Sequence, residues 1–144
     1  MSNMDNRVFI TRAGAVDPLV QLLQDGDAEG KTQAAVALTK LASNIMSIKV
    51  AIVRAGAVDP LVQLLQDGNA KGKAEAARAL ANLTAGINDG DNRVAIVCAG
   101  AVDPLVQLLR TGDAEGKAEA ARALTIIAVS NVDSKVAIVR AGAV

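Results

Sequence analysis

The sequence contains no histidine, tryptophan or tyrosine, and its 144 residues include one phenylalanine and one cysteine. Without histidine, the chain lacks the commonest acid–base group and metal ligand of proteins. A single cysteine, Cys98, excludes an internal disulfide and a thiolate metal cluster, and it weakly favours a reducing compartment. Glycine-rich phosphate-binding loops are missing as well. We therefore expect no catalytic residue, no metal site and no cofactor, and so no enzyme.

An excess of charge of one sign is also missing, because 15 Lys and Arg residues balance 15 Asp and Glu residues. No Lys/Arg-rich run occurs, whereas nucleic-acid binding usually needs a concentrated basic surface, so we expect no nucleic-acid partner. The longest apolar stretches, such as Val94–Val102, reach about half of the ~20 residues of a membrane helix. The polar start, Met1–Asn6, leads into no signal-peptide core. We expect no membrane insertion and a soluble, cytoplasmic protein, with the nucleus as the alternative location.

What the chain does contain is a repeated phrase, Ala-Gly-Ala-Val-Asp-Pro-Leu-Val-Gln-Leu-Leu. Complete copies begin at Ala13, Ala55 and Ala99, and a fourth begins at Ala141 and stops at Val144, giving spacings of 42, 44 and 42 residues. Self-similarity at this period predicts stacked helical units, each of which contacts only its neighbours. The composition, 51% hydrophobic but 1% aromatic, predicts an aliphatic interior rich in alanine.

The sequence of each unit predicts three helices. Capping residues, a glycine and a proline mark the ends of the first two. For the first helix we expect an N-cap at Asp5, Ser47, Asp91 and Asp133 and a left-handed glycine at its end, at Gly14, Gly56, Gly100 and Gly142. For the second helix we expect an Asp cap followed by proline in the first helical position, as in Asp59-Pro60. The three prolines of the chain, Pro18, Pro60 and Pro104, all occupy this place.

The third helix of each unit carries the longest amphipathic pattern. Its expected caps are Asp27, Asn69 and Asp113. In the second unit, Ala76, Leu80 and Leu83 follow a helical spacing that predicts a buried stripe. Glu75, Arg78 and Asn82 lie on a different face, which we expect to be polar and exposed.

Three helices in about 42 residues, with a Gly-Ala bend and Leu-Val-Gln-Leu-Leu in the middle helix, resemble the armadillo repeat of the regular importin-α and vacuolar-protein-8-like type. The HEAT repeat, with two helices per unit and no such bend, is the weaker alternative. The resemblance implies an all-α, right-handed solenoid over residues 1–144. We expect repeat 1 at 5–43, repeat 2 at 47–86, repeat 3 at 91–130, and the first helix of a partial fourth repeat at 133–144.

In that family the third helices line a concave groove that binds extended peptides, through ladders of asparagine and, in the importin type, tryptophan. The resemblance therefore implies groove positions on the third helices. The tryptophan position holds Val36, Arg78 and Arg122, the asparagine position holds Lys40, Asn82 and Ile126, and one turn earlier lie Gln33, Glu75 and Glu119. Only Asn82 matches, so a receptor for nuclear-localisation signals is disfavoured.

These groove positions allow two interpretations. Arg78 and Arg122 could pair with an acidic peptide, or each could pair with Glu75 or Glu119 three residues earlier on its own helix, which we favour. Asn82 could clamp a ligand backbone or be an ordinary surface residue. Cys98 stands where other copies have arginine, so we expect it to be partly exposed.

The function expected from these observations is a scaffold that binds a protein or peptide partner in the groove. The alternatives are a structural or designed module with no groove ligand, and the disfavoured importin-type receptor. No polar capping repeat stands at either end. We therefore expect a fragment of a longer array or an engineered piece, which self-associates through its uncapped ends or by exchanging the helix Asp133–Ala141.

Overall fold

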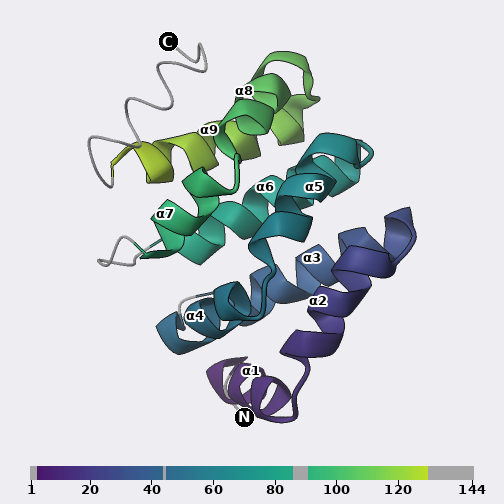
Figure 1. The fold of residues 1–144 in the computed structure, drawn as a ribbon, viewed down its shortest axis with the longest axis vertical. Coiled ribbons are helices and arrows are strands. Elements are labelled where there is room, and N and C mark those ends of the chain that lie inside the picture. Colours follow the sequence, from purple (N-terminus) through teal and green to yellow (C-terminus); the bar gives the residue numbers. More distant parts are fainter. Residues whose placement is uncertain (1–2, 44, 86–90, 130–144) are drawn as a thin grey trace.

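The computed structural model describes residues 3–43, 45–85 and 91–129, and for residues 3–5 and 91 it describes the backbone alone. These residues form helices and no strand. The helices are α1 (Asn3–Arg12), α2 (Val16–Asp25), α3 (Ala28–Ala42), α4 (Met46–Arg54), α5 (Val58–Asp67), α6 (Ala70–Thr84), α7 (Asp91–Cys98), α8 (Val102–Thr111) and α9 (Ala114–Ala128). They follow one another as three successive layers of three helices, which Figure 1 shows stacked along the molecule. The partial fourth unit, with Asp133 and Gly142, lies outside the described residues.

The third helices form the spine of this stack. α6 packs against α3 on one side and α9 on the other, and α2, α5 and α8 each pack against the third helix of their own layer. Figure 1 shows α3, α6 and α9 following one another from the N-terminal layer to the last described layer. Equivalent residues of neighbouring third helices therefore come close together, although they are separated by more than 40 residues in the sequence.

A left-handed glycine makes the bend between the first and second helices, as the sequence predicted. The φ angles are +88° at Gly14, +88° at Gly56 and +85° at Gly100. Other residues adopt this conformation only at a steric cost. The bend brings the amide of Ala57 within 3.4 Å of the carbonyl of Ile52, which closes the C-terminus of α4.

The predicted start of the second helix is wrong by about two residues. α5 begins at Val58, after Ala57 in a right-handed helical conformation, and no side chain caps it. Asp59 and Pro60 therefore occupy the second and third helical positions. Proline is still harmless there, because the first four amides of a helix have no partner within it. Asp59 lies in the first turn, where the helix dipole favours a negative charge.

The caps predicted for the first helices are also wrong where the structure can test them. α4 begins at Met46, before Ser47, and Ile45 precedes it without any side-chain cap. α1 begins at Asn3 and so includes Asp5. α7 is described from Asp91 onward and without that side chain, so the cap expected at Asp91 stays a prediction. The aliphatic content of these helices, packed into the stack, makes side-chain capping unnecessary for their formation.

The caps of the third helices are confirmed. The side chains of Asp27, Asn69 and Asp113 accept hydrogen bonds from the backbone amides of Gly30, Gly72 and Gly116, at 2.8, 2.9 and 2.8 Å. Each bond satisfies one amide at a helix start that would otherwise lack a partner. The longest helices of the chain thus begin at positions defined by a side chain.

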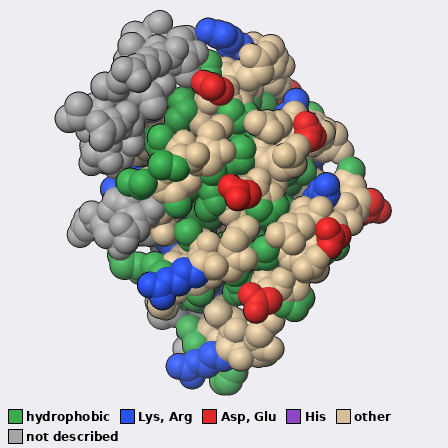
Figure 2. All heavy atoms as spheres, in the orientation of Figure 1, with side chains coloured by type: hydrophobic (Ala, Val, Ile, Leu, Met, Phe, Trp, Pro, Cys, Tyr) green, Lys and Arg blue, Asp and Glu red, His purple; other side chains and the backbone are tan. Residues whose placement is uncertain are grey.

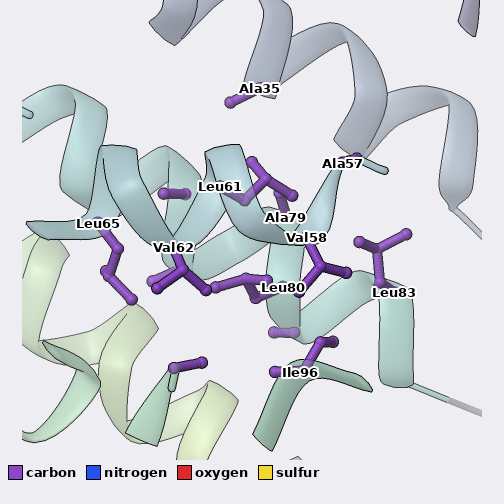
Figure 3. Close-up of a cluster of buried hydrophobic side chains, with 14 of the residues drawn as sticks. Ala35, Ala57, Val58, Leu61, Val62, Leu65, Ala79, Leu80, Leu83 and Ile96 are labelled. Atoms are coloured by element: carbon purple, nitrogen blue, oxygen red, sulfur yellow. The ribbon is translucent and has the colours of Figure 1, made fainter. Parts of the chain in front are cut away.

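The hydrophobic core runs between the layers. The predicted stripe Ala76, Leu80 and Leu83 is 0%, 1% and 2% exposed. Figure 3 shows Leu80 and Leu83 of α6 near Val58 and Leu61 of α5, with Ala35 of α3 on one side and Ile96 of α7 on the other. One cluster of small aliphatic side chains therefore joins successive repeats.

Within the described residues, no single helix is long and apolar enough to cross a membrane. The segments Asn92–Cys98 and Val102–Thr111 together reach the required length and composition, but they are bent by 74°. Both contribute buried residues, such as Ile96 and Leu105, to the core of the stack.

Candidate functional site

α3, α6 and α9 pack side by side, so the predicted groove positions lie on neighbouring helices. Hydrogen bonds and ion pairs connect five of these residues, and the remaining four take no part in those contacts. The connected residues are Glu75, Arg78, Asn82, Glu119 and Arg122. Gln33 and Lys40 are exposed on α3, and Val36 and Ile126 are partly buried. Polar contacts are thus concentrated between repeats 2 and 3.

Arg78 is the centre of these contacts and bridges the two repeats. Its Nη1 lies 2.6 Å from Glu75 Oε1, and its Nη2 lies 3.1 Å from Glu115 Oε1 and 3.3 Å from Glu119 Oε1. The predicted pairing within the helix is therefore present, with two further carboxylates from α9. Burial opposes the charge on Arg78, but Glu75 and Glu119 outweigh this effect and raise the pKa of Arg78.

The expectation that Glu75 is exposed is wrong, because its side chain is 3% exposed. Arg78 covers it from one side, and Lys71 Nζ lies 3.2 Å from its Oε1 on the other. The carboxylate tolerates burial because two cations pair with it. Helical periodicity alone could not show this, because the neighbouring helices that complete the burial belong to other repeats.

Sequence reasoning missed Glu115, which joins the same cluster. Glu115 occupies in repeat 3 the position that Lys71 occupies in repeat 2, 44 residues earlier. Their side chains lie 3.6 Å apart in the structure. Opposite charges at the same position of successive repeats would have predicted this contact between Lys71 and Glu115.

Arg122 holds the same repeat position as Arg78 but has different partners. Its Nη2 donates to Asn82 Oδ1 at 3.0 Å, across the repeat boundary. Its Nη1 lies 3.9 Å from Glu119 Oε2, which is beyond hydrogen-bonding distance. The bond to Arg122 fixes the Asn82 amide, so that its oxygen is occupied and its NH₂ group remains a donor.

Sequence reasoning also missed a basic residue on the first helix of each repeat. Arg7 on α1 donates to the carbonyl of Ser43 at the end of α3, and Lys49 on α4 donates to the carbonyl of Ala85 at the end of α6. A cation at this place satisfies a terminal carbonyl and opposes the negative end of the helix dipole. The pattern was visible in the sequence, since Arg7, Lys49 and Arg93 share one repeat position.

Lys49 also lines a small pocket at the C-terminal ends of the third helices. The pocket has a volume of about 240 Å³ and is lined by Ser43, Lys49, Asn82, Ala85 and Arg122. Lys49 is 6% exposed as a residue. Burial, and to a lesser degree the neighbouring charge of Arg122, lower the pKa of Lys49.

Charge elsewhere is dispersed. On the described part of the face seen in Figure 2, acidic and basic side chains are scattered among each other, without a basic patch.

Two equivalent clefts lie between the second helices, with volumes of about 450 and 320 Å³. Pro60 lines the first cleft and Pro104 lines the second. Among the described residues, no group of His, Cys, Asp and Glu side chains is arranged to hold a metal ion. Cys98 is exposed.

Comparison with known families identifies the architecture. The model of the armadillo/beta-catenin-like repeat matches three segments, residues 3–43, 47–85 and 90–129. The chain belongs to the armadillo repeat family. The three helices per matched segment and the glycine bend between the first two fit an armadillo repeat rather than a two-helix HEAT unit.

The solved structures similar to this armadillo chain include engineered proteins. Among them is an engineered protein from a structural genomics consortium, with 43% identity and a TM-score of 0.90 over 97% of this chain and 56% of that chain. Another is a designed armadillo repeat protein in complex with the peptide (KR)4, with 34% identity and a TM-score of 0.88 over 96% of this chain and 57% of that one.

A third, with 32% identity and a TM-score of 0.89 over 96% of this chain and 58% of that one, is described as computationally designed for modular peptide recognition. This chain thus spans little more than half the length of these three structures. An engineered segment fits these neighbours. No curated protein matches the chain significantly.

Proposed function

We propose that this armadillo segment binds an extended peptide or a partner segment along the surface formed by α3, α6 and α9. The observation that carries the proposal is the arrangement of the residues in which the repeats differ. The bends and cores repeat, whereas one groove position changes from Val36 to Arg78 and Arg122, and another holds Lys40, Asn82 and Ile126. Variation on a surface carried by a constant scaffold is typical of binding repeats.

The designed neighbours support peptide binding in general. One is in complex with (KR)4 and another was designed for modular peptide recognition. Extended peptides suit such a surface, because each repeat contributes equivalent side chains at a regular spacing. For this chain we propose the same binding mode, with Asn82 and Arg122 among the contacts.

A peptide array with extended acidic, basic and neutral sequences tests the proposal. Hits are measured by fluorescence anisotropy on the parent protein and on Asn82→Leu, with Gln63→Leu on α5 as the matched control. We expect Asn82→Leu to weaken binding about tenfold, because it removes polar contacts worth about 1 kcal/mol or more. Gln63→Leu leaves binding unchanged.

Of three other outcomes, the first narrows the proposal to one class of peptide and the other two contradict it. Binding restricted to clusters of lysine and arginine would support the importin-type alternative. No saturable binding to any class would support a structural module without a groove ligand. Equal weakening by Asn82→Leu and Gln63→Leu would place the binding surface away from the third helices.

A further inference from the structure

The pocket lined by Ser43, Lys49, Asn82, Ala85 and Arg122 differs in charge from the rest of the third-helix surface. Two of its lining residues are cations and none is acidic. Towards the N-terminal ends of α6 and α9 the arrangement is the opposite. There two cations, Lys71 and Arg78, lie among three carboxylates, those of Glu75, Glu115 and Glu119. The surface is therefore polarised along the helix axes, with its cationic excess at the pocket.

Within the described residues, the cations of this pocket retain unused donors. An ammonium group has three N–H donors, and one contact of Lys49 is to the Ala85 carbonyl. A guanidinium has five donors, and Arg122 donates one to Asn82. Because Arg122 occupies the oxygen of Asn82, the NH₂ group of that amide is a third donor at the pocket. The lining thus combines two positive charges with several N–H groups.

The backbone carbonyls at this place do not cancel that character. Helix C-termini carry partial negative charge, which repels anions. Lys49 already binds the carbonyl of Ala85, and Arg7 binds that of Ser43. Glu119, which also lies near Arg122, is bound by Arg78 at 3.3 Å. The ion pair between Glu119 and Arg122 spans 3.9 Å, which is too long for a hydrogen bond, so it leaves the N–H donors of that guanidinium available.

Like charges close together in a partly buried place repel each other, and the lowered pKa of Lys49 reflects both burial and Arg122. An anion between them relieves the repulsion and gains charge-assisted hydrogen bonds. The volume of about 240 Å³ is several times that of one water molecule, and it accommodates the end of an acidic side chain.

We propose that this pocket is a carboxylate subsite, in which Lys49, Arg122 and the Asn82 amide bind the acidic side chain of an extended peptide lying along α6 and α9. The inference rests on the peptide-binding function proposed above. It assigns that function a ligand chemistry, namely an Asp or Glu at the position that passes the ends of α3 and α6. Arg78, enclosed by three carboxylates, has no such role.

Fluorescence anisotropy with two labelled, C-terminally amidated decapeptides tests the subsite. One carries Glu at alternate positions and the other carries Gln, so that they differ in charge and not in length. At about 50 mM salt, where charge interactions are weakly screened, we expect the Glu peptide to bind about tenfold more tightly. Arg122→Gln reduces this preference to about twofold or less, while Lys117→Gln, which removes an exposed lysine of α9 outside the pocket, preserves it.

Lys49→Met is the second variant, because it removes the buried charge and keeps the length of the side chain. It should also abolish the preference for Glu, and circular dichroism establishes whether it folds. If it unfolds, the Arg122→Gln result alone decides.

A third measurement compares a neutral peptide that has a free C-terminus with the same peptide amidated. If the free terminus binds more tightly and Arg122→Gln removes that preference, the subsite binds a terminal carboxylate instead of a side-chain carboxylate.

The two proposals fail in distinguishable ways. If Glu and Gln peptides bind equally and Asn82→Leu weakens both, peptide binding holds and the carboxylate subsite is overturned. The same conclusion follows if the preference for Glu survives Arg122→Gln. If neither peptide binds, and the array also finds no ligand, peptide binding is overturned and the subsite with it.

Discussion

At the scale of single residues, the structure gives different roles to side chains that occupy the same repeat position. Arg78 and Arg122 are equivalent in sequence, but Arg78 contacts three carboxylates, whereas Arg122 donates to the Asn82 amide and lines a cationic pocket. The difference arises from the neighbouring repeat, since Glu115 and Glu119 on α9 face Arg78. Position within a repeat therefore does not determine the electrostatic role of a residue.

Arg78→Gln should destabilise the protein more than Glu75→Gln. The first change leaves Glu75 buried with Lys71 as its remaining cation, while the second leaves Arg78 paired with Glu115 and Glu119. We expect a loss of about 1 kcal/mol for Arg78→Gln, less than is usual for charged hydrogen bonds, because its side chain is 33% exposed to solvent. Urea unfolding with Lys117→Gln as control measures this, and the reverse order of the two variants would contradict the assigned network.

Gly56→Ala should destabilise the folded protein through the backbone conformation at this residue alone. An added Cβ at Gly56 meets no atom within 4 Å, but the φ angle of +88° is unfavourable for other residues. We expect a loss of about 1–2 kcal/mol and a smaller loss for Gly56→Asn, because asparagine tolerates this region better. Thermal unfolding of the two variants provides the comparison. Equal losses would mean that side-chain crowding, rather than the φ angle, sets the effect.

At the scale of elements, the third helices differ from the others in how they begin. They start at an Asp or Asn whose side chain bonds an amide, as Asn69 does with Gly72. α4 and α5 start without such a bond. The third helices also form the most extensive contacts between repeats, so a defined start fixes the register of the residues they present.

Asn69→Ala and Ser47→Ala test this difference directly. Removing the cap of α6 should lower the free energy of unfolding by about 0.5–2 kcal/mol. Ser47 is exposed within α4 and is no cap, so its replacement should change stability by less than about 0.5 kcal/mol. Urea denaturation separates the two cases. A comparable loss in both variants would restore Ser47 as the cap of α4.

At the scale of the whole molecule, stability comes from contacts between layers. Leu80 is 1% exposed within the cluster that Figure 3 shows between α5, α6 and the adjoining layers. Leu80→Ala should cost about 2–5 kcal/mol, because the cavity it leaves is enclosed on all sides. Leu22→Ala, at a position that is 40% exposed, should cost clearly less. Calorimetric melting decides the matter, and equal melting temperatures for the two variants would refute the core assignment.

Apolar surface on the first layer should make the protein associate with itself. Ile10 is 48% exposed, whereas its equivalents Ile52 and Ile96 are 0% exposed in the stack. Ile10 also lines a largely apolar pocket of about 840 Å³ with Pro18, Leu19 and Leu41. We expect a repeat of a second copy to cover this surface, since repeats cover the equivalent surfaces within the chain.

Light scattering at increasing protein concentration tests this association. We expect the mean mass to rise with concentration in the parent protein and to stay near that of the monomer in Ile10→Lys, because a lysine at this place opposes burial of the pocket. Gln24→Lys, which adds the same charge at an exposed site on α2, should behave as the parent does. A monomer at all concentrations in the parent would refute the prediction.

Local features were predictable wherever the deciding interaction lies within one repeat. The left-handed glycines, the third-helix caps and the stripe of Leu80 and Leu83 all depend on residues a few positions apart. The starts of the first and second helices were mispredicted for a physical reason. Ser47 and Asp59 are good capping residues by type, but packing and the glycine bend let each helix begin before them.

The candidate site was predictable as a set of positions and not as a set of contacts. Periodicity placed Glu75, Arg78 and Asn82 on one side of a helix, yet the partners Glu115, Glu119 and Arg122 come from the next repeat. Lys49 was overlooked because it lies on a first helix. It is 36 residues from Ala85 in the sequence, and the two come into contact only when the helices stack.

The sequence by itself determined the repeat, its three helices, the glycine bends and the aliphatic stripe, because short-range sterics and periodicity fix these features. The tertiary structure alone decided which charges meet across the repeats. It buried Glu75, enclosed Arg78, and placed Lys49 beside Arg122, since stacked helices bring together residues that are far apart in the chain. Electrostatic character depends on such distances, and these exist only once the layers have packed.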